Sequence, residues 1–196
     1  MENNVRHEVL GRLRHDGTVR QLLLVETAEG SEALAHYYVK GAAGWRLRAA
    51  GSAFIGKHGT GKQREGDLKT PCGDLRPLRA FGILPDPGSL LPYLRIVPGT
   101  VACDARGPHY NRIIQTDPSN GGPEELSGER MWELSPEYSY GIETDYNAAG
   151  IWPLGSAIFV HCKGDKKWTG GCIALDLPFM KKVLTTADEG LLISIR

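Results

Sequence analysis

One stretch near the C-terminal end decides the fold: Gly155-Ser-Ala-Ile-Phe-Val-His161-Cys-Lys-Gly-Asp-Lys-Lys-Trp168-Thr-Gly-Gly-Cys172-Ile-Ala-Leu175. Its apolar run, 157–160, is long enough for one buried strand and too short for a helix, and it leads into His161. A polar turn follows, and a second apolar run starts directly after Cys172. We therefore expect two neighbouring strands that place the imidazole of His161 beside the thiol of Cys172.

This pair of residue types suits nucleophilic catalysis. A thiol attacks a carbonyl as the thiolate, and a nearby imidazole can take its proton to give a thiolate–imidazolium pair. The resulting oxyanion needs fixed N–H donors, and Gly171 lets the backbone come close to it without a Cβ. The alternative is a purely structural role, with Cys172 inert and buried and His161 hydrogen-bonded in the core. Composition alone favours this structural role. The paired glycines before Cys172 favour the catalytic interpretation, because a packed strand does not need them.

The composition predicts a single β-rich domain over residues 1–196, in which strands within about 7–50 are an integral part. The 196 residues can bury a proper core, and 41% of them are hydrophobic. The 25 glycines and 12 prolines imply many turns between short segments. With 23 acidic and 23 basic residues, no global field attracts nucleic acid or anionic lipid. We expect a monomer with no cofactor and no metal.

The N-terminus and the cysteines do not decide in which cellular compartment the protein works. No apolar run is long enough to cross a bilayer, and the polar N-terminus shows no secretory signal. Either the protein stays inside the cell, or a signal was trimmed, or export uses another route. Cys72, Cys103, Cys162 and Cys172 permit disulfides without requiring them.

Alternation and turn signals predict strands over 7–13, 20–27, 33–39, 45–48, 95–97, 100–104, 142–147 and 190–195. Helical spacing predicts a helix over 177–185, with Asp176 as its N-cap and Pro178 in its first turn. The polar segment 116–130 is predicted to be a lid, a binding loop or disordered. The glycine-rich segment 57–75 lacks the spacing of a phosphate-binding loop, so phosphate binding is a minor alternative.

Several segments together resemble one family. They are Glu65-Gly-Asp-Leu-Lys-Thr-Pro-Cys-Gly73, Tyr110-Asn111, Tyr138-Ser-Tyr140, Tyr146-Asn147, Gly155-Ser-Ala-Ile-Phe-Val-His161 and Thr169-Gly-Gly-Cys-Ile-Ala174. Their order and spacing resemble the L,D-transpeptidase catalytic domain, the YkuD family, in a branch with Gly-Cys-Ile-Ala at the cysteine. The resemblance runs over nearly the whole chain.

The resemblance implies a mainly β fold, a YkuD-like β-sandwich of mixed sheets with one or two short helices. It implies a transferase that forms a cysteine acyl-enzyme on peptidoglycan stem peptides, in cell wall biogenesis and cell shape. Cys172 is then the nucleophile, His161 the general base, and the N–H groups of Cys172 and Gly171 the oxyanion hole. Thr169, Gly170, Tyr140 and Tyr146 take substrate-binding positions.

The resemblance further implies carbapenem-type inhibitors, a bacterial cell-envelope location (periplasm or cell wall), and an amine or water as acceptor. Water gives a hydrolase, that is, a carboxypeptidase or a link-hydrolysing activity. The chain departs from the common motif, since Gly170 replaces a second histidine and Ala174 replaces Arg or Asn.

One competing hypothesis is a peptidoglycan-binding module with little catalysis. Another is a metal site built from His161, Cys162 and Cys172 with His58, which strand geometry disfavours because His161 and Cys162 point to opposite faces.

Overall fold

The structure is a computed structural model, and it describes residues 2–116 and 126–196. Most of the residues in regular secondary structure lie in strands, which confirms the predicted fold class. The helices are α1 (Glu2–Arg12) and α2 (Leu177–Leu184), with short 3₁₀ turns η3 (Met131–Glu133) and η4 (Glu137–Ser139). The strands are β1 (Gln21–Thr27), β2 (Glu32–Gly41), β3 (Gly44–Phe54), β4 (Gly73–Leu75), β5 (Pro77–Gly82), β6 (Tyr93–Arg95), β7 (Thr100–Cys103), β8 (Ile113–Gln115), β9 (Gly128–Arg130), β10 (Gly141–Thr144), β11 (Phe159–Cys162), β12 (Ile173–Leu175) and β13 (Leu191–Ile195).

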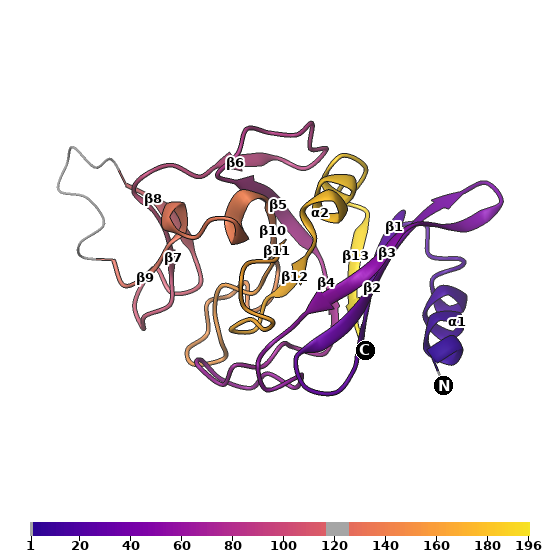
Figure 1. The fold of residues 1–196 in the computed structure, drawn as a ribbon, viewed down its shortest axis with the longest axis horizontal. Coiled ribbons are helices and arrows are strands. Elements are labelled where there is room, and N and C mark those ends of the chain that lie inside the picture. Colours follow the sequence, from indigo (N-terminus) through magenta and orange to yellow (C-terminus); the bar gives the residue numbers. More distant parts are fainter. Residues whose placement is uncertain (1, 117–125) are drawn as a thin grey trace.

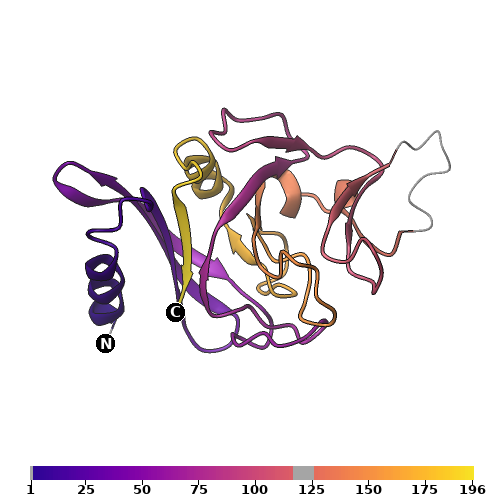
Figure 2. The ribbon, with the colours of Figure 1, turned by 180° about the vertical axis from the view of Figure 1, so that it is seen from behind.

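Ten strands form one mixed sheet that curls on itself (Figures 1 and 2). Its order is β4-β13-β1-β2-β3-β12-β11-β10-β5-β6, and the pairs β1/β13, β11/β12 and β5/β6 are parallel. Only Arg76 separates β4, at one edge, from β5, near the other. The two ends of the sheet must therefore approach each other, which gives the predicted sandwich-like arrangement.

The main core fills the inside of this curl. Its buried side chains come from both ends of the chain, including Leu23, Tyr37, Val160 and Ile193. The helix α2 packs Phe179, Met180, Val183 and Leu184 into the same core. Asp176 takes the predicted N-cap position with extended backbone, although its side chain makes no capping hydrogen bond. The strands β1 to β3 are thus part of the central sheet.

The prediction of a strand over 7–13 is wrong, because residues 7–12 belong to α1 and Leu13 lies in the turn that follows it. Val9 and Leu13 are buried and Val5 packs against the same cluster, which is the i, i+4, i+8 spacing of a helix face. Positions 9 and 13 also fit an alternating pattern, so the sequence pattern was ambiguous there. Neither helix in the described part of the chain has the length and apolar character needed to cross a membrane.

A second, three-stranded sheet of order β8-β7-β9 lies beside the β11 side of the large sheet (Figure 1). A separate apolar cluster joins the two, with Phe81, Met131, Tyr138, Phe159 and Cys172 among its buried members. Of the polar segment 116–130, residues 117–125 lie outside the described residues, and Gly128–Arg130 is β9. The small sheet and η4 thereby form one wall over the face that carries Cys172.

Candidate active site

The parallel pair β11/β12 brings His161 and Cys172 to one face of the sheet. Its register pairs Val160 with Ile173 and His161 with Ala174, so Cys172 comes one residue before the pairing begins. Side chains two residues apart on a strand share a face, and directly paired residues do too. Cys172 therefore shares the face of Ala174 and of its partner His161.

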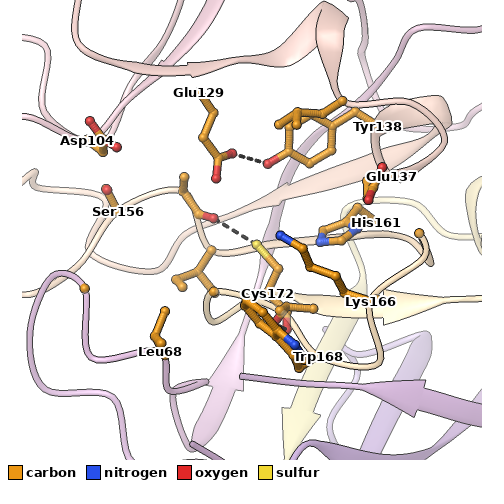
Figure 3. A pocket seen from close by; sticks show the side chains of 18 of the residues that line it. Leu68, Asp104, Glu129, Glu137, Tyr138, Ser156, His161, Lys166, Trp168 and Cys172 are labelled. Carbon is orange, nitrogen blue, oxygen red and sulfur yellow. Dashed lines mark hydrogen bonds between the residues drawn. The ribbon is translucent and has the colours of Figure 1, made fainter. Parts of the chain in front are cut away.

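Both side chains line one cavity of about 310 Å³ (Figure 3). Its wall also includes Lys62, Glu129, Tyr138 and Trp168. The lining carries carboxylates from Glu65, Asp104, Glu129 and Glu137 and ammonium groups from Lys62 and Lys166. The cavity can thus hold a ligand that bears both negative and positive groups.

The ring of His161 is held in one tautomer. Its Nδ1 lies 2.7 Å from the Cys162 carbonyl oxygen, which can only accept, so Nδ1 carries the proton. The other nitrogen, Nε2, is then unprotonated and can accept a proton. Tyr138 packs edge-on against the ring, with 5.5 Å between ring centroids. Burial lowers the pKa of His161, against smaller raising effects from the Cys162 carbonyl and Glu137, so the imidazole is neutral near pH 7. The Cys162 carbonyl thereby orients the imidazole of His161.

The thiol of Cys172 is protonated at rest. The residue is 8% exposed, and Sγ–H donates to the Ala157 carbonyl at 3.0 Å while Sγ accepts the Phe159 N–H at 3.3 Å. Burial, and next the Glu129 carboxylate, raise the pKa of Cys172 to about 12, although the Phe159 N–H and Lys62 oppose this. The sequence-based expectation of a thiolate–imidazolium pair does not describe the resting site, which holds a neutral thiol and a neutral imidazole.

The turn Thr169-Gly170-Gly171 is fixed by the side chain of Thr169. Its Oγ1 donates to the Cys172 carbonyl at 2.6 Å and accepts the Gly171 N–H at 3.1 Å. Gly171 has φ +147°, and a Cβ there would lie 2.8 Å from the Lys69 carbonyl oxygen, so only glycine fits without strain. The Gly171 N–H, expected to serve the oxyanion, is occupied by Thr169. Thr169 and Gly170 both line the cavity.

The structure does not bring Tyr140 and Tyr146 to the cavity. Tyr140 is buried in the main core and donates its hydroxyl to the Pro85 carbonyl. Tyr146 packs against the same core and donates to the Leu154 carbonyl. Tyr138 lines the cavity instead and donates to Glu129 (Figure 3). Residues 138 and 140 both precede β10. Tyr138 lies in η4 and Tyr140 already has extended backbone, and their side chains enter different clusters.

Sequence reasoning missed the contribution of the loop 57–70. Asp67 organises it, accepting the N–H groups of Gln63, Arg64 and Lys69 and pairing with the Lys62 ammonium at 2.9 Å. Burial raises the pKa of the Asp67 carboxyl, but these donors outweigh burial and hold the pKa well below its usual value. The loop's own carboxylate takes the N–H groups that a phosphate would need, so the phosphate alternative is not supported.

The loop also supports the cavity wall. Glu65 accepts hydrogen bonds from the hydroxyls of Tyr110 at 2.6 Å and Ser156 at 2.7 Å, and the Gly155 N–H donates to the Tyr110 hydroxyl. These contacts tie the Glu65 segment to residues 155–156, which lie just before β11. The motif Glu65-Gly-Asp is thus a structural brace for the site.

The metal-site alternative is not supported by the placement of its ligands. Within residues 2–116 and 126–196, no group of three His, Cys, Asp or Glu side chains is arranged to hold a metal ion. Cys162 points away from the cavity into the main core, where Sγ–H lies 3.5 Å from the Tyr140 carbonyl. All four cysteines are free.

Comparison with known proteins gives matches among solved structures only. No family model matches the chain, and no curated protein matches it. A point-mutant form of the helical cell shape determining protein Pgp2 from Campylobacter jejuni matches at 16% identity and TM-score 0.49, over 95% of this chain and 52% of that chain. Another Pgp2 structure matches at 18% identity and TM-score 0.44, over 90% and 47%. Bd1075 of Bdellovibrio bacteriovorus matches at 14% identity and TM-score 0.48, over 91% and 48%. The chain spans about half the length of the structures that it matches, and likeness at this level does not assign an activity.

Proposed function

We propose that this protein is a cysteine-dependent acyltransferase that acts on peptidoglycan stem peptides as an L,D-transpeptidase, with hydrolysis when water is the acceptor. One observation carries the proposal: His161 and Cys172 occupy one face of neighbouring strands and line one cavity, with Nε2 of His161 left as the acceptor. The resemblance of the surrounding motifs selects the substrate class. Because peptidoglycan lies in the bacterial envelope, the protein acts there.

The neutral resting pair defines the first step. On substrate binding, Cys172 turns its S–H from the Ala157 carbonyl to Nε2 of His161, and Sγ attacks the scissile carbonyl carbon as the proton leaves. The tetrahedral oxyanion collapses, the C–N bond breaks, and the imidazolium gives its proton to the departing amine. An acceptor amine or water, deprotonated by His161, then attacks the thioester and releases Cys172 as a thiol.

The cavity lining suits such a substrate. A stem peptide carries carboxylates and amines, and the cavity lining includes ammonium groups from Lys62 and Lys166 together with several carboxylates. Trp168 adds an aromatic wall, and the ammonium groups of Lys57 and Lys166 each lie about 5 Å from its ring centroid. These groups provide both polar recognition and apolar contact for a peptide.

Incubation with defined muropeptides tests the proposal. Disaccharide tetrapeptide is supplied with and without an acceptor stem, for wild type and for Cys172→Ala, and the products are read by mass. We expect loss of the terminal residue, or its exchange for the acceptor, with wild type alone. Muropeptide binding by both proteins with no product from either would establish the binding-module alternative, which the buried, protonated thiol favours.

A further inference from the structure

The slot between two glycines beside the nucleophile is occupied by Lys62. A Cβ at Gly155 would lie 2.3 Å from Lys62 Cε, and a Cβ at Gly171 would lie 3.6 Å from Lys62 Nζ. Both glycines have positive φ, +110° and +147°. The fold thus leaves room for an ammonium group directly against the residue that precedes Cys172.

This ammonium has hydrogen-bonding capacity to spare. The Lys62 side chain is 2% exposed, and within the described part of the chain its Nζ donates to Asp67 Oδ1 at 2.9 Å and to the Arg64 carbonyl at 3.3 Å. An ammonium has three N–H donors, so one is left, and Lys62 lines the cavity. Asp67, which is not among the residues that line the cavity, holds the ammonium in place.

The proposed reaction requires a hydrogen-bond donor at this point in the site. An oxyanion formed by attack of Cys172 needs preorganised N–H groups. The Cys172 N–H is one, but the Gly171 N–H is taken by Thr169 Oγ1. We infer that Lys62 supplies the second oxyanion donor, acting as a catalytic residue that binds the negative oxygen of the tetrahedral intermediate. This assignment rests on the proposed acyl transfer, but not on the identity of the acyl donor.

Two reagents separate this role from others. Acylation by p-nitrophenyl acetate passes through an oxyanion, whereas alkylation by iodoacetamide displaces iodide without one. Any change in the pKa or access of the Cys172 thiol alters both rates, so the ratio of acylation to alkylation isolates the oxyanion. Both rates are measured at Cys172 by nitrophenolate release and by peptide mass, in the full chain.

We expect Lys62→Met to lower this ratio by about a hundredfold, the usual effect of losing one oxyanion donor. Lys182→Met is the matched control, because it removes an exposed ammonium on α2 that does not line the cavity, and we expect it to leave the ratio close to that of wild type. If Lys62→Met does not fold, Lys62→Gln keeps an N–H donor for Asp67, and its shorter, neutral side chain is expected to give a smaller loss in the same direction.

An unchanged ratio in the neutral Lys62 variants would overturn the assignment, as would an equal loss in Lys182→Met, which would show that the ratio follows the net charge of the protein and not a contact at Lys62. Wild type that is alkylated but never acylated by the ester would overturn both this assignment and the proposed acyl transfer. Wild type that is acylated by the ester but inert towards muropeptides would overturn the peptidoglycan assignment alone, and the role of Lys62 would still be read from the ratio.

Discussion

Replacing Gly171 by alanine tests whether the turn before Cys172 is built for catalysis. The added Cβ would lie 2.8 Å from both the Lys69 carbonyl oxygen and Ile158 Cδ1, and the backbone has φ +147°. The methyl of Ile158 can rotate away, but the carbonyl of Lys69 belongs to the backbone of the braced loop. Relief must therefore come from movement of the turn itself, which carries Cys172.

The expected loss of stability in Gly171→Ala has two contributions. Holding a residue with a Cβ in this backbone region costs about 1–3 kcal/mol, and crowding a packed site costs about 1–3 kcal/mol more. At roughly 2–4 °C per kcal/mol for a domain of this size, the melting temperature should fall by several degrees or more. A displacement of Sγ by about 1 Å would slow acylation roughly a hundredfold.

Gly170→Ala is the matched control, because no atom lies within 4 Å of where its Cβ would be. Stopped-flow acylation of Cys172 by an activated ester and thermal unfolding are measured for both variants. We expect Gly170→Ala to unfold and react much like wild type, within about 0.5 kcal/mol. Equal tolerance of alanine at both positions would refute the reasoning that Gly171 is fixed by its surroundings.

Three further results are expected. Thr169→Val removes the hydroxyl that bonds the Cys172 carbonyl and the Gly171 N–H, so it should destabilise the fold by about 1–3 kcal/mol and slow acylation. Thr169→Ser retains both hydrogen bonds. Identical denaturation midpoints for the two variants would contradict this prediction. Alkylation of Cys172 should keep rising with pH towards about 12, since burial raises the pKa of this thiol and deprotonation supplies the nucleophile, and a plateau below about pH 8.5 would instead reveal a preformed thiolate. A carbapenem should add its mass to Cys172, and an adduct that persists in Cys172→Ala would show that the drug reacts elsewhere.

Local patterns in the sequence predicted the parts of the fold that depend on local chemistry. The apolar run before His161, the strand at the C-terminus and the helix after Asp176 all carry strong short-range signals, and the structure has β11, β13 and α2 there. The strand prediction for residues 7–13 was wrong because the buried positions there fit the period of a strand as well as that of a helix. Only the packing of Val9 and Leu13 against β1 and β13 selects the helix.

The site was predictable where sequence neighbours act together and unpredictable where distant segments meet. His161, Cys172 and the Thr169-Gly170-Gly171 turn lie within one short stretch, so their juxtaposition followed from a strand–turn–strand pattern. Lys62 reaches the site only because Asp67 folds the loop 57–70 and Gly155 leaves room for its side chain. The protonation of Cys172 depends on burial by the wall that carries Tyr138 and Glu129, which no local pattern reveals.

The acyl-enzyme itself is the most direct measurement of the central claim, that His161 and Cys172 act as base and nucleophile in one cavity. Protein mixed with disaccharide tetrapeptide is quenched at intervals and its intact mass is recorded for wild type and His161→Gln. We predict an acyl adduct on Cys172 of wild type, formed about a hundredfold or more slowly without the imidazole. A wild-type thiol that stays free while the peptide is turned over, or an adduct that forms equally fast in His161→Gln, would contradict the account.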